Sequence, residues 1–122
     1  MNYTSDISDG SILNNIKKLL GLGPEYNCFD QDIIIHINSV FASLHQMGVY
    51  NKNLDKCFEI TDNSATWSDF LEDDNTINFI KTYVYLKVKL AFDPPANSVV
   101  QASYENQIKE LEVRLYTRRG GY

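Results

Sequence analysis

Residues 75–92 read NTINFIKTYVYLKVKLAF, and their apolar side chains fit either a strand or a helix. Alternating apolar positions between residues 82 and 90 are typical of a strand. At helical spacing, however, the apolar pattern continues from Ile77 to Phe92, and a segment of this length is longer than most strands. We therefore predict a central helix, buried on two sides. Its stripes are Ile77, Ile80, Val84, Val88 and Ala91, and Phe79, Tyr83, Leu86 and Leu90.

Three further helices are expected around this one. Ser11 is a candidate N-cap for a helix over residues 12–20. Asp30 is a candidate N-cap for a longer helix with an apolar stripe at helical spacing, and residues 98–101 have a capping-box pattern that opens the last helix. The predicted buried side chains are Ile12, Leu13, Ile16, Leu19, Leu20, Ile33, Ile34, Ile37, Val40, Phe41, Leu44, Met47, Val100, Tyr104, Ile108, Leu111 and Leu115.

Residues 58–67 are predicted to form a short β-hairpin. Phe58 and Ile60 alternate with polar Glu59, and turn-forming residues follow at 61–64. The predicted fold class is therefore mainly α: a small bundle of about four helices with a short β-hairpin inserted between the second and third. The expected domains are a flexible N-terminal arm (1–10), a helical domain (11–117) and a basic C-terminal tail (118–122).

The length and charge of the chain restrict its partners. The 122 residues suffice for one domain, and a formal net charge of −5 disfavours a protein that grips duplex DNA. The charge is uneven: residues 1–54 carry −2, residues 55–74 carry −6 and residues 75–122 carry +3. This layout suits contacts between copies of the chain, or it is only a solvated acidic loop beside an ordinary helical surface. No apolar run is long enough to span a membrane, so no membrane partner is expected.

The sequence offers no catalytic, metal or cofactor site. His36 and His45 are nine positions apart on one predicted helix, so they point in opposite directions. Cys28 and Cys57 belong to no metal or catalytic motif, and the glycines form no phosphate-binding loop. We expect a protein that is not an enzyme.

The order of several segments resembles the head–tail connector (adaptor) proteins of tailed bacteriophages. No single segment is diagnostic, but together they cover roughly residues 11–119. The segments are ILNNIKKLL (12–20), the Asp30-led helix, SATWSDFL (64–71), KTYVYLK (81–87) running into FDPP (92–95), and QIKELEVRL (107–115).

The resemblance implies a non-enzymatic structural protein of the virion neck, assembled in the host cytoplasm. Such proteins form a ring, typically of twelve copies, beneath the portal protein at the capsid vertex. They link the portal to the next tail-completion or tail protein, and the genome passes through the lumen without sequence-specific contacts. By the same analogy the C-terminal segment docks on the portal; its candidate residues are Leu115, Tyr116, Arg118, Arg119 and Tyr122.

Two further sets of residues are candidates for a ring. Acids that line a lumen would repel phosphates, and the candidates are Glu72, Asp73 and Asp74. A ring also needs two different surfaces on each copy, and the acidic 55–74 region could meet basic and aromatic side chains of a neighbour. The candidates are Trp67, Lys81, Tyr85, Lys87, Lys89 and Lys109; Trp67 could equally lie in the domain's own core, and for Tyr83 the core is favoured.

Two other functions fit the same helical pattern less well. Another neck component, such as a stopper or a tail terminator, tends to be rich in β-structure. A small helical DNA-binding or packaging factor would need a row of Arg and Lys on its recognition helix. The central helix is too apolar for that role, and the last one alternates its charges.

Overall fold

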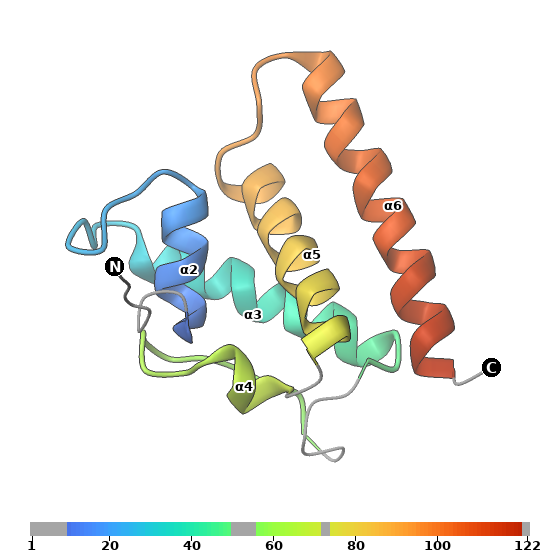
Figure 1. The fold of residues 1–122 in the computed structure, drawn as a ribbon. Coiled ribbons are helices and arrows are strands. Elements are labelled where there is room, and N and C mark those ends of the chain that lie inside the picture. Colours follow the sequence, from blue (N-terminus) through green and yellow to red (C-terminus); the bar gives the residue numbers. More distant parts are fainter. Residues whose placement is uncertain (1–9, 50–55, 72–73, 121–122) are drawn as a thin grey trace.

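The computed structural model describes residues 10–49, 56–71 and 74–120, and within the last range the side chains of 75–116. These residues form five helices and no strand (Figure 1). The predicted helical class is therefore confirmed. The helices are α2 (Ile12–Leu19), α3 (Asp30–Gln46), α4 (Trp67–Phe70), α5 (Asp74–Phe92) and α6 (Ser98–Gly120).

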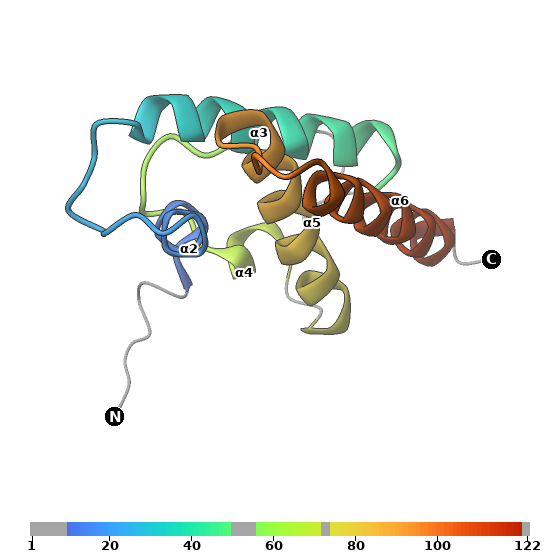
Figure 2. The same ribbon diagram turned by 90° about the horizontal axis from the view of Figure 1, so that it is seen from above.

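Helix α5 is the centre of the molecule, as its two apolar stripes predict. It packs against α3 and against α6, while α2 packs on α3 (Figure 2). Both stripes supply buried side chains, among them Ile80, Tyr83 and Val88, each at most 1% exposed. The strand interpretation of residues 82–90 is wrong, because these residues lie within the single helix Asp74–Phe92.

The ends of the helices follow local hydrogen bonding. The Ser11 hydroxyl accepts a hydrogen bond from the Asn14 amide, which confirms Ser11 as the N-cap of α2. Asp30 is instead the first residue of α3, which has no side-chain cap. At α6, the Asn97 side chain accepts hydrogen bonds from the amides of Val99 and Val100, so the cap lies one residue before the predicted one.

The core confirms most of the predicted buried positions. Helix α3 buries Ile33, Ile34, Ile37, Val40, Phe41 and Leu44. An aromatic cluster formed by Phe41, Phe58, Trp67 and Phe70 fills the space between α3 and α4, with ring centres 4.8–6.3 Å apart. Three predicted core residues, Leu19, Ala91 and Val100, are instead exposed at the surface.

The predicted β-hairpin over residues 58–67 is absent, because a side chain of α3 takes the place of a second strand. The side chain of Asn38 on α3 bonds both backbone groups of Ile60: its amide donates to the carbonyl over 2.9 Å, and its oxygen accepts from the N–H over 2.8 Å. A helix side chain thus satisfies the groups that a second strand would have paired.

The expected hairpin ends in the start of helix α4, because Thr66 is the N-cap of this helix and Trp67 its first residue. Thr66 and Asp69 form a capping box, in which each side chain bonds the other's backbone amide. The turn before α4 is present as predicted, because Asp62 accepts hydrogen bonds from the amide and the hydroxyl of Ser64. Among the described residues, one isolated antiparallel β-bridge joins Ser11 to Thr66.

None of the helices in the described ranges combines the length and the apolar character that crossing a lipid bilayer requires.

Candidate subunit and partner surfaces

Surfaces, and not a catalytic centre, are the candidate sites of this molecule. In the part of the chain that the structure describes, no three His, Cys, Asp or Glu side chains come together as a metal site. Cys28 and Cys57 are both free thiols. Burial raises the pKa of Cys57, with a smaller contribution from Glu59.

Trp67 lies in the core of its own chain. It is 3% exposed, and its indole N–H donates a hydrogen bond to the Asn15 side chain of α2 over 3.1 Å. The ammonium group of Lys81 lies 5.9 Å from the centre of the indole ring. Trp67 therefore ties α4 to α2 within the protomer, and a direct contact with a neighbouring subunit stays a prediction.

The two candidate tyrosines of α5 differ in burial. Tyr83 is 1% exposed, and its hydroxyl donates a hydrogen bond to Oε2 of Glu112 on α6 over 2.9 Å. Burial, reinforced by Glu112, raises the pKa of Tyr83 strongly. Tyr85 is half-buried, and burial together with Tyr104 raises its pKa as well. Tyr83 is thus a core residue that fastens α6 to α5, while Tyr85 reaches the surface.

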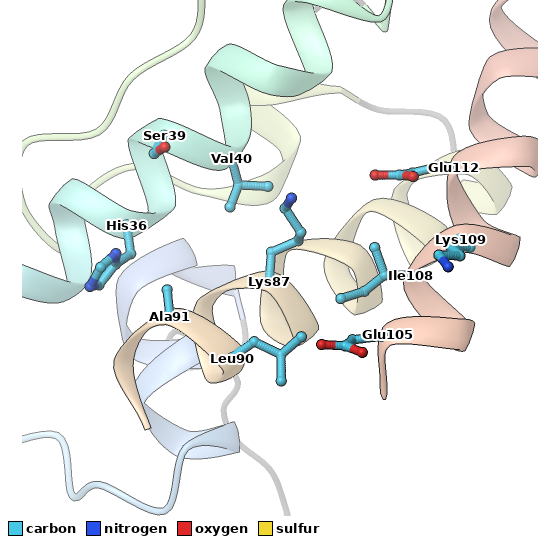
Figure 3. Close-up of a pocket in the computed structure, with 10 residues that line it drawn as sticks. All are labelled: His36, Ser39, Val40, Lys87, Leu90, Ala91, Glu105, Ile108, Lys109 and Glu112. Atoms are coloured by element: carbon cyan, nitrogen blue, oxygen red, sulfur yellow. The ribbon is translucent and has the colours of Figure 1, made fainter. Parts of the chain in front are cut away.

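A groove of about 550 Å³ lies between α3, α5 and α6. Figure 3 shows Lys87 reaching from α5 into this space, between Val40 of α3 and Glu112 of α6. Its ammonium group lies 5.8 Å from the centre of the Tyr83 ring. The groove is lined by His36, Ser39, Val40, Lys87, Leu90, Ala91, Glu105, Ile108, Lys109 and Glu112.

The structure does not gather the four candidate lysines into one patch. Lys81 lies over Trp67, and Lys87 lies in the groove. Lys89 forms an ion pair with Asp93, one turn further along the chain, at 3.0 Å. Lys109 lies on α6, exposed, at the rim of the groove. Lys87 and Lys109 therefore share one groove, and the other two contact different parts of the chain.

The side chains of the candidate lumen acids are not among those that the structure describes. Glu72 and Asp73 lie outside the described residues, and Asp74 is described only as the first residue of α5. Within the same acidic region, Asp62 and Asp69 are exposed and bonded within their own turn and capping box. Hydrogen bonds from Ser64 lower the pKa of Asp62.

The candidate portal-docking residues lie at the end of α6, except Tyr122, which lies outside the described residues. Leu115 is 1% exposed and belongs to the core, whereas Tyr116 is 58% exposed. Arg118 and Arg119 are within the helix, whose described part ends at Gly120. Residues 118–120, assigned above to the tail, thus continue α6; the domain division itself stays a prediction.

Sequence reasoning missed two exposed apolar surfaces. One lies on residues 19–35, with Phe29 as its central aromatic ring, and the other lies along the outer side of α6, where Val113 is 66% exposed. In α6, the sequence signal that could have revealed this surface is a second series of residues, beginning at Val99 and spaced alternately three and four apart.

Comparison with known proteins identifies the family. The family described as "Phage connector protein" matches residues 12–121, which is nearly the entire chain. Among curated proteins and solved structures, nothing matches significantly. The match confirms the resemblance to phage connector proteins and indicates a structural role in the virion neck, in contact with portal or tail proteins. Because the match spans α2 to the end of α6, the chain belongs to the phage connector protein family.

Proposed function

We propose that the chain is one subunit of a closed ring that joins the portal protein to the next tail-completion or tail protein. The observation that carries this proposal is the family match over residues 12–121. By the same resemblance, the ring contains twelve copies and is assembled in the host cytoplasm. The protein acts by shape and contact, and needs neither a cofactor nor catalysis.

A closed ring requires each copy to present two different surfaces, one to each neighbour. The described acids Glu59, Asp62 and Asp69 are exposed on the segment around α4. Lys109 is exposed on α6, and Lys87 lies in the adjacent groove. Pairing of the acidic region of one copy with these lysines of the next is a contact that the charges support.

The end of α6 is the proposed docking element for the portal. Past Leu115, whose side chain is buried, α6 continues to Gly120 and includes exposed Tyr116 and two arginines. An aromatic side chain beside arginines is a common composition of interface centres. The portal is thus contacted by a segment that follows Leu115, the last side chain of α6 described as buried.

The lumen is proposed to carry the genome without gripping it. A net charge of −5 and the acids at 72–74 would repel the phosphates of DNA. Weak, repulsive contact suits a conduit, because a basic lumen would hold the DNA and slow its passage.

Electron microscopy of the purified full-length protein with the portal of the same phage tests this function. We expect a collar of additional density on the portal, with rotational symmetry. Ring formation by the protein alone is not required, because binding to a partner can drive assembly. Portal particles without a collar, at protein concentrations well above those of the portal, would refute the proposal.

A further inference from the structure

The exposed large hydrophobic side chains of the described residues fall into two groups. The first group lies on residues 19–35 and consists of Leu19, Tyr26, Phe29 and Ile35, between 39% and 64% exposed. The second lies on α6 and consists of Val99, Val100, Val113 and Tyr116, between 39% and 74% exposed. Exposed apolar side chains mark candidate interaction sites, and these two segments of the chain carry them.

Helix α6 has a second, exposed stripe beside its buried one. Its inner stripe, which includes Ile108 and Leu115, packs on the core. The outer stripe is spaced three, four, three and four residues apart, the spacing of a helix that packs on a partner, and its central Asn106 is a polar residue of the kind that fixes register in such contacts. We call it the outer α6 face: Val99, Ala102, Asn106, Lys109 and Val113, all of them exposed.

The first group is built on a loop that is held rigidly. Lys17 of α2 is 1% exposed, and its ammonium group forms an ion pair with Asp30 at 2.9 Å and donates to the Pro24 carbonyl over 3.1 Å. The rings of Tyr26 and Phe29 meet edge to face at 5.9 Å. We call Tyr26 and Phe29 the loop surface. A fixed aromatic platform loses little conformational entropy when it binds.

The Phe29 ring also meets Phe92 of α5, edge to face, at 5.4 Å. The loop surface is therefore fastened to two helices, by the ion pair at α2 and by this ring contact at α5.

The two surfaces differ in charge and lie on opposite sides of the molecule. The outer α6 face carries one charged side chain, the exposed Lys109, whereas residues 19–35 contain three acids and no Lys or Arg. Two of those acids, Glu25 and Asp32, are exposed, and the third, Asp30, is paired with Lys17. The loop of residues 21–29 and helix α6 lie at opposite ends in both Figure 1 and Figure 2.

We propose that the outer α6 face of one copy binds the loop surface of the next copy. This inference rests on the proposed ring and names the apolar contact that closes it. Two different surfaces at opposite ends of one protomer generate a head-to-tail series, which closes into a ring when the rotation allows. Pairing of α6 with α6 would instead give a two-fold dimer and would leave the loop surface uncovered.

Site-specific cross-linking on the assembled ring tests the contact, because Cys28, next to Phe29 of the loop surface, is a natural exposed thiol. The test protein is Val113→Cys in a Cys57→Ser background, bound to the portal and treated with a short bismaleimide. Cys28 and residue 113 lie on opposite sides of one protomer, so a cross-link between them joins two copies. We expect a ladder of dimers, trimers and larger species on a denaturing gel.

Three controls define the result. Gln107→Cys in the same background is exposed on a different side of α6, and should give no ladder. Val113→Cys with Cys28→Ser should give no cross-linked species; dimers in that sample would mean that α6 pairs with α6 and would overturn the inference. Asn106→Cys, on the outer α6 face, repeats the test and should again give a ladder.

The outcomes separate this inference from the proposed function. A collar on the portal without a ladder from either Val113→Cys or Asn106→Cys would overturn the contact and leave the ring intact. Absence of the collar with the unmodified protein would refute the ring, and the contact with it.

Discussion

At the scale of single residues, Asn38 takes the place of a partner strand. It bonds both backbone groups of Ile60, which is 2% exposed. Asn38→Ala leaves a buried donor and a buried acceptor without partners, and each costs on the order of 1–3 kcal/mol. We expect the free energy of unfolding to fall by roughly 2 kcal/mol or more, measured by urea denaturation with circular dichroism.

The matched control for this prediction is Asn78→Ala on α5. Asn78 is exposed, so its substitution should change the unfolding free energy by no more than about 0.5 kcal/mol. Equal effects of the two substitutions would show that the Asn38 hydrogen bonds do not hold the segment in place.

Tyr83 makes the free energy of unfolding depend on pH in the alkaline range. Burial and Glu112 raise the pKa of Tyr83 above its ordinary value of 10.0. The folded state therefore holds the phenolic proton more tightly than the unfolded chain. Its contribution is complete below about pH 10 and is lost as the pH rises beyond that value. Tyr83→Phe should cost about 1–2 kcal/mol at neutral pH and flatten the alkaline decline.

Unfolding free energies between about pH 8 and 11 would check the Tyr83 prediction. Part of the decline should persist in Tyr83→Phe, because burial also raises the pKa of Tyr85. Tyr26→Phe, at an exposed position, should keep the full decline. An identical alkaline slope in Tyr83→Phe and in the unmodified protein would contradict the assignment.

At the scale of elements, Leu115 is the last residue of α6 whose side chain is described as buried. Deletion of residues 116–122 removes no side chain that the structure describes as buried. We expect the helical circular dichroism signal per residue and the unfolding free energy to change little, while capture of the portal on an affinity resin is lost.

A double substitution, Arg118→Ala with Arg119→Ala, separates the two arginines from the rest of the deleted segment. If the arginines carry the contact, this variant should also lose most of the capture at physiological salt. Full portal capture by the protein lacking residues 116–122 would refute the docking role of the α6 end.

The elements that the sequence could predict are those whose packing follows from the spacing of their own apolar residues. The stripes of α3 and α5 record contacts along one helix, so periodicity finds them. The hairpin prediction failed because the bonds of Ile60 go to Asn38, 22 residues earlier in the chain, and no local pattern reveals such a partner. The exposure of Phe29 could not be predicted either, since the sequence of a loop does not distinguish an aromatic residue buried in the core from one that a neighbouring subunit covers.

At the scale of the whole molecule, the uneven charge predicts assembly that depends on salt. Lys87 lies over the Tyr83 ring and Lys89 pairs with Asp93, so each retains a local contact while remaining partly exposed. Charge reversal at both, Lys87→Glu with Lys89→Glu, turns attraction toward an acidic neighbour into repulsion. With about 1 kcal/mol for each of the two exposed pairs, we expect ring assembly on the portal to weaken roughly thirtyfold at low salt.

Sedimentation of portal complexes across a salt series measures this effect. The difference from the unmodified protein should shrink toward about 1 M salt, where the screening length is near 3 Å. Ala42→Glu with Gln46→Glu adds negative charge at exposed positions of α3 and should assemble normally. Circular dichroism must show both variants folded, because the carboxylate introduced at position 89 would face Asp93 across one helical turn. Assembly that is unchanged at every salt concentration would leave apolar contacts, such as the one proposed for α6, as the force that closes the ring.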